Sequence, residues 1–136
     1  MSAKSFVLAT VAGGVTLFVL GGLLYGLLLH DFFESHSAAN TMRETPIWWA
    51  LIIGELLLAA LVTLIFGRWA SISTPLGGLK AGAIIGLLLA AAINFTMFAV
   101  STVFVDPTAG VVDAVVSAIR LGIGGAVIGL VLGKTA

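Results

Sequence analysis

The sequence predicts an all-α integral membrane protein, a four-helix bundle of two tandem helical hairpins with both termini in the cytoplasm. Hydrophobic residues make up 60% of the 136 residues and charged residues only 9%, against roughly 45–50% and 25% in soluble domains. The mean hydropathy is +1.23. Four apolar stretches reach the length of about 20 residues that a helix needs to cross about 30 Å of hydrocarbon. We therefore expect a single transmembrane domain over residues 1–136.

The four spans are expected at about residues 5–29, 46–67, 75–100 and 107–133. The first apolar run, of about 25 residues, exceeds the 7–15 of a signal-peptide core, so we expect it to be retained. Each later span begins at a proline that follows a residue able to cap a helix, at Thr45-Pro46, Thr74-Pro75 and Asp106-Pro107. Proline at the first helical position lacks only an N–H that would be unpaired there. Gly67 and Gly133 mark the expected ends of the second and fourth spans.

Basic residues in the connections predict the orientation, because cytoplasmic loops carry an excess of lysine and arginine. An N-terminus inside the cell leaves only Arg43 outside and places the other basic residues of the chain's termini and connections inside, namely Lys4, Arg68, Lys80 and Lys134. We therefore expect both termini on the cytoplasmic side.

Several classes of function are disfavoured by the composition. Six basic residues balance six acidic ones, so there is no basic patch for nucleic acid. The chain has no cysteine, and hence no thiolate nucleophile or thiolate metal site. It also has no serine-hydrolase, phosphate-binding or HExxH metalloprotease motif. We predict that the protein is not an enzyme and has no cofactor.

One polar stretch, His30 to His36, could be read as a metal site. On a helix, His30 and Glu34 would stand one turn apart and could share an ion with Asp31 or His36. A solvated helix end explains these residues better, so we predict no metal.

Small residues spaced by four indicate helix contact faces, because hydrophobicity cannot hold helices together inside a bilayer. Three such faces occur: Gly22 and Gly26; Gly78, Gly82, Gly86 and Ala90; and Ala118, Gly122, Gly125, Gly129 and Gly133. They can pack within the monomer or against a second protomer. The last face lies nearly opposite the stripe of Asp113, Ser117 and Arg120 on the same span. If that stripe faces the bundle interior, the glycine face is expected to remain partly free for another protomer.

Polar residues at membrane depth are functional candidates by default, since they are costly there. Glu55, Asn94 and Arg120 are expected at a similar depth in the outer half of the bundle, with Tyr25, Asp113 and Ser117 above them. We predict that Glu55 and Arg120 contact each other, directly or through Asn94 or one water. Such a pair can act as a staple that sets helix register, or as part of a substrate or ion site.

The stretch Leu20-Gly21-Gly22-Leu23-Leu24-Tyr25-Gly26-Leu27-Leu28 resembles the glycine-x-x-tryptophan-tyrosine-glycine signature of a bacterial family of small four-span membrane proteins of unknown function. Leu24 stands at the tryptophan position of that signature, and Leu27 where the family often has proline. The resemblance implies a bacterial origin, and hence the cytoplasmic membrane. It implies no activity.

Two functions follow as hypotheses. The first is a non-catalytic membrane protein, accessory or self-associating, whose partners are the bilayer and a homo-oligomer or larger membrane complex. The second is a small oligomeric transporter or channel that uses the polar layer around Glu55, Asn94 and Arg120. An open crevice that reaches Glu55 would favour transport, whereas a closed bundle with Glu55 bonded to Arg120 would favour the structural role.

Overall fold

A computed structural model describes residues 1–36 and 45–135 of the chain, and these form an all-helical bundle. Its elements are α1 (Ala3–Gly21), η1 (Gly22–Leu28), α2 (His30–His36), α3 (Trp48–Leu64), η2 (Ile65–Ala70), α4 (Pro75–Val100) and α5 (Pro107–Thr135), where η denotes a π-helix. Four helical stretches, α1 with η1, α3 with η2, α4 and α5, are long and apolar enough to cross a membrane. This confirms the predicted four-helix class.

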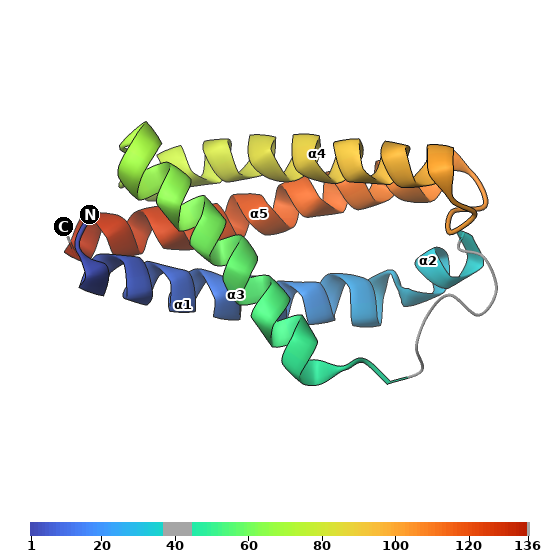
Figure 1. Cartoon of the computed structure of the whole chain (residues 1–136), viewed down its shortest axis with the longest axis horizontal. Helices are drawn as coiled ribbons and strands as arrows, with labels where there is room; N and C mark the ends of the chain where they lie inside the picture. Colours follow the sequence, from blue (N-terminus) through green and yellow to red (C-terminus); the bar gives the residue numbers. More distant parts are fainter. Residues whose placement is uncertain (37–44, 136) are drawn as a thin grey trace.

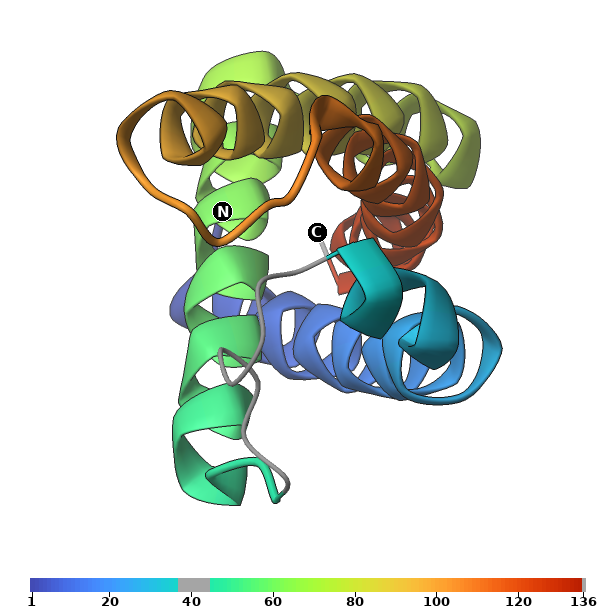
Figure 2. The ribbon, with the colours of Figure 1, turned by 90° about the vertical axis from the view of Figure 1, so that its right-hand side faces the viewer.

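The helices form two hairpins of different geometry (Figure 1). α4 and α5 run side by side over their whole length, whereas α3 crosses α1 obliquely. α5 also packs against α1, and the view along the bundle shows it between α4 and α1 (Figure 2). The N- and C-terminal ends lie together, where Ser5 Oγ donates a hydrogen bond to the Thr135 carbonyl at 2.8 Å. Both termini therefore lie on the same side of the membrane.

Two of the three predicted helix starts have the expected cap. The Thr74 hydroxyl accepts a hydrogen bond from the Gly77 N–H at 3.1 Å, and Asp106 Oδ1 accepts one from the Thr108 N–H at 2.9 Å. The prediction that the second span starts at Pro46 is wrong by two residues. Ile47 is still extended (φ −80°, ψ 96°) and α3 begins at Trp48, with no side-chain cap.

The prediction that Gly67 ends the second span is also wrong. The helix continues through η2 to Ala70 and ends at Ser71, which takes the left-handed conformation (φ 54°). Gly67 has a different role, because a Cβ there would collide with the Met1 side chain. Gly133 likewise lies inside α5, with the Ser73 carbonyl against it. Both glycines make room for a neighbouring segment rather than ending a helix.

The two hairpin partners α4 and α5 meet through what we call the glycine seam: Gly78, Gly82 and Gly86 of α4 with Gly125 and Gly129 of α5. A Cβ on Gly82 would fall on the Leu121 carbonyl, and one on Gly125 on the Gly78 carbonyl. Gly122 also packs on α4, against Leu79 and Ala83.

The glycine face of α5 is thus used within the monomer, and the expectation that it stays partly free for a second protomer is wrong. α5 is the central helix, and half of its most apolar window is buried. α4 covers the glycine face of α5, and side chains of α3, α4 and η1 contact its polar stripe.

The predicted first-span face of Gly22 and Gly26 makes no helix contact in the part of the chain that the structure describes, since a Cβ on either would have no atom within 4 Å. Other glycines form the contacts of α1 instead. A Cβ on Gly13 would lie 2.6 Å from Ile128, and one on Gly14 would lie 2.7 Å from Leu56. α1 therefore packs through its middle, before the stretch that carries Gly22 and Gly26.

Candidate functional site

The predicted contact between Glu55 and Arg120 is present and direct. Nη1 of Arg120 lies 2.7 Å from Oε1 and 2.9 Å from Oε2 of Glu55. The side chains are only 12% exposed for Arg120 and 13% for Glu55. The same Nη1 donates to the Leu17 carbonyl at 3.3 Å, and Gly21 lies beside both charges. The pair therefore joins α1, α3 and α5 at one point.

Burial of the pair makes its loss costly in free energy. Removing one member of a buried pair leaves the other charge uncompensated, which typically costs about 3–5 kcal/mol. Nε of Arg120 is buried and has no hydrogen-bond partner among the described residues. Among the described residues, the guanidinium is thus held through Nη1, which donates to both carboxylate oxygens of Glu55 and to the Leu17 carbonyl.

A second polar cluster surrounds Asp113. The Tyr25 hydroxyl donates to Asp113 Oδ1 at 2.5 Å, and Nδ2 of Asn94 donates to Oδ2 at 2.6 Å. Nδ2 of Asn94 also donates to the Gly110 carbonyl at 3.1 Å. Ser117 Oγ lies 3.2 Å from the Tyr25 hydroxyl. This cluster ties η1 and α4 to α5.

The single polar layer that the sequence predicts is therefore divided in two, and Asn94 belongs with Asp113 rather than with Glu55 and Arg120. The reason is register. α4 ends at Val100, six residues after Asn94, and Asp113 lies six residues after the Pro107 that starts α5. In two antiparallel helices joined by a short loop, residues equally far from the loop lie at the same height, and Asn94 therefore lies beside Asp113.

Tyr25 connects the two clusters. Its hydroxyl reaches Asp113 and its ring lies under Arg120, with Cζ 5.8 Å from the ring centroid. Tyr25 lies in η1, where the backbone bonds one residue further back than in an α-helix, as the Leu29 N–H does to the Leu24 carbonyl at 2.9 Å. Single π-helical turns within α-helices are frequent at functional sites. The apolar periodicity of the sequence carries no signal for this change of winding.

A crevice of about 190 Å³, which we call the lateral crevice, opens beside these clusters. Leu58 of α3 forms one wall, Leu89 and Ile93 of α4 form the other, and the floor is α5 with Asp113, Ser117 and Arg120. Leu89 and Ile93 are part of the exposed apolar surface. The crevice therefore opens sideways, toward lipid.

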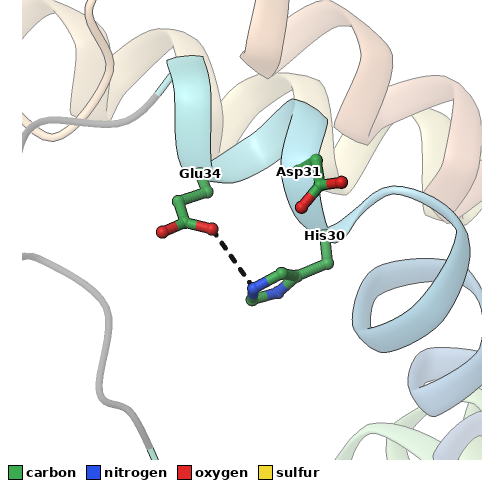
Figure 3. Close-up of side chains that lie close together, drawn as sticks. All are labelled: His30, Asp31 and Glu34. Atoms are coloured by element: carbon green, nitrogen blue, oxygen red, sulfur yellow. Dashed lines mark ion pairs between the residues drawn. The ribbon is translucent and has the colours of Figure 1, made fainter.

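The residues weighed as metal ligands lie on the short helix α2 (Figure 3), which Figure 1 shows at the end of the bundle away from the termini. Nε2 of His30 is 3.3 Å from a Glu34 carboxylate oxygen, and His30, Asp31 and Glu34 offer ligand atoms within 4.8 Å of one another. All three are exposed. His36 is not with them, because its ring stacks on Phe32. Exposed groups already paired across one helical turn form an ordinary solvated helix end, and the absence of a metal stays a prediction.

Comparison of the chain with protein-family models, with curated proteins and with solved structures found no match. The four apolar helices indicate a small membrane protein. Its role has to be inferred from the geometry of the chain alone.

Proposed function

We propose that the protein is a non-catalytic component of the bacterial cytoplasmic membrane that associates laterally with a second copy of itself. The observation that carries this proposal is the first part of α3. Residues 48–54, which we call the projecting turns, are exposed without interruption, and α3 leaves the bundle there (Figure 2).

Exposed apolar surface does not by itself drive association in lipid, because lipid covers it equally well. Small residues that let two backbones approach do favour association. Ala50 and Gly54 are one turn apart on the projecting turns, and a Cβ on Gly54 would have no described atom within 4 Å. The projecting turns thus carry an open small-residue pair, on a stretch of helix that meets α1 where Trp48 lies beside Phe18.

The polar groups support a role without catalysis. Glu55 is bonded to Arg120, and Asp113 to Tyr25 and Asn94. Each carboxylate is thus occupied by a partner on another element. Such pairing favours holding the helices in register over accepting or donating protons in a reaction.

Crosslinking in native membranes tests the self-association. Because the chain has no cysteine, Ala50→Cys provides a single reporter on the projecting turns. We expect oxidation to give a disulfide-linked dimer, and Gly54→Leu added to Ala50→Cys to reduce its yield severalfold.

Val115→Cys, on the exposed face of α5, is the matched control and should stay monomeric. Equal dimer yields at both positions, or no dimer from Ala50→Cys, would contradict the proposal. A reproducible crosslink of Ala50→Cys to a different protein would make the chain an accessory subunit of a larger complex instead.

The orientation is tested separately by impermeant thiol labelling of intact cells. Thr108 and Ser73 are exposed and lie at opposite ends of the bundle. With both termini in the cytoplasm, Thr108→Cys should react and Ser73→Cys should not. Labelling of Ser73→Cys alone would reverse the orientation.

The lateral crevice favours a second candidate function, that of a small oligomeric transporter or channel. A polar floor beside an opening to lipid is the feature that a closed structural bundle lacks. Uptake into proteoliposomes would test this function independently of the oligomeric state.

A further inference from the structure

The lateral crevice has an unbalanced charge. Arg120 is neutralised by Glu55 at 2.7 Å. Asp113, on the same floor, has no basic side chain within 4 Å among the described residues. Arg120 and Asp113 line the floor, and when Glu55, which pairs with Arg120 from behind the lining, is counted with them, the acidic groups outnumber the basic one.

The carboxylate of Asp113 accepts hydrogen bonds from two neutral side chains. Both of its oxygens accept, one from the Tyr25 hydroxyl at 2.5 Å and one from the Asn94 amide at 2.6 Å. Because the donors are neutral, they stabilise the charge without cancelling it.

We propose that the lateral crevice binds a lipophilic cation, with an ammonium head against Asp113 and an apolar tail between α3 and α4. Coulomb attraction to Asp113 is strong beside the low-dielectric walls of Leu58, Leu89 and Ile93. The tail finds an apolar path because the opening faces lipid. A volume of about 190 Å³, against roughly 30 Å³ for one water, suits a small ammonium head and excludes a large rigid ring system.

This inference shares its site with the second candidate function but does not depend on transport. It is equally independent of self-association, because the crevice lies within one chain. If the cation binds but is not transported, the binding proposal stands and only the transport function is excluded.

The test is equilibrium dialysis of labelled octyltrimethylammonium against the full chain in nanodiscs of zwitterionic lipid, with empty nanodiscs subtracted. Octyl sulfate has the same tail and the opposite charge, and it serves as the matched probe. We expect saturable binding of the cation and much weaker binding of the sulfate. Equal binding of the two probes would overturn the proposal.

Three variants locate the site. Asp113→Asn keeps a hydrogen-bonding side chain and removes the charge, and should weaken cation binding by about tenfold or more. Ala90→Leu fills the crevice from α4 without removing any hydrogen bond, and should also abolish binding. Asp31→Asn makes the same charge change at the exposed α2 helix and should leave binding unchanged.

Unaltered cation binding in either Asp113→Asn or Ala90→Leu would overturn the assignment of the binding site to the lateral crevice. An equal loss in Asp31→Asn would assign the binding to surface charge rather than to the crevice. If Asp113→Asn does not fold, the comparison of octyltrimethylammonium with octyl sulfate on the wild type and the binding measured for Ala90→Leu of wild-type folded yield decide.

Discussion

The two hairpins of this bundle use the same kind of residue in opposite ways. In the α4–α5 hairpin, whose helices pack along their whole length, Gly82 and Gly125 bring backbone against backbone. In the α1–α3 hairpin, the helices cross, and Gly14 receives the Leu56 side chain near the crossing. The first hairpin is a continuous seam and the second is a single crossing.

The difference teaches how helices are held in lipid. Because water is absent, contact energy comes from van der Waals packing and hydrogen bonds rather than from burial of apolar surface. A continuous glycine seam supplies packing on its own. The crossing of α1 and α3 has less packing to offer, and it is joined to α5 by the Glu55–Arg120 pair and to α4 by the Asp113 cluster. The polar clusters therefore compensate for the smaller contact of the first hairpin.

The largest effect is expected from breaking the glycine seam. Gly82→Leu would place a side chain on the Leu121 carbonyl backbone, which cannot move without separating the helices. We expect loss of the folded state, a destabilisation above about 5 kcal/mol. Folded yield and an SDS titration in mixed micelles measure it.

Gly26→Leu is the matched control, because Gly26 belongs to the other hairpin and a Cβ there meets no described atom within 4 Å. It should fold with near-normal yield. Equal damage from both variants would mean that the seam is no different from the open glycine face.

The next largest effect is expected at the ion pair that joins the hairpins. Glu55→Gln leaves Arg120 uncompensated and should destabilise the fold by about 3–5 kcal/mol. The double variant Glu55→Gln with Arg120→Gln should recover part of that loss, because coupled neighbours are not additive. SDS titration of the wild type, both single variants and the double variant gives the coupling free energy. If the losses of stability in the two single variants simply add in the double variant, Glu55 and Arg120 do not act as a coupled junction.

The smallest effect is expected at the helix starts. α4 is capped by Thr74, whereas α3 begins after Ile47 without a side-chain cap. Thr74→Ala should therefore cost about 1 kcal/mol, and Ile47→Ala should cost much less. The same SDS titration resolves the two, and a larger loss from Ile47→Ala would show that the capping difference between the hairpins has no energetic weight.

Much of the fold is readable from local sequence. The number of spans, their hydropathy and the caps at Thr74 and Asp106 are properties of single segments, and these predictions are confirmed. The Glu55–Arg120 contact was also predicted, because a charge at membrane depth needs an opposite charge at the same level and few residues qualify.

The glycine motifs show where local information ends. Gly22 with Gly26 and Gly78 with Gly82 have the same spacing, yet only the second pair makes contacts in the described structure. Spacing defines a face of a helix, but contact needs another helix turned toward that face. Ala50 and Gly54 form such a face on the projecting turns, and we propose a second copy of the chain as its partner.

Thus the sequence by itself determined the number, order and approximate lengths of the spans, since these depend on the chain and on the thickness of the bilayer. Only the tertiary structure decided which glycines meet, that Asn94 bonds Asp113 rather than the ion pair, and that Asp113 lies on the floor of the lateral crevice. The physical reason is that a contact between helices depends on their relative rotation, shift and tilt. Those three quantities are set by all the neighbours of a helix at once, and no single segment encodes them.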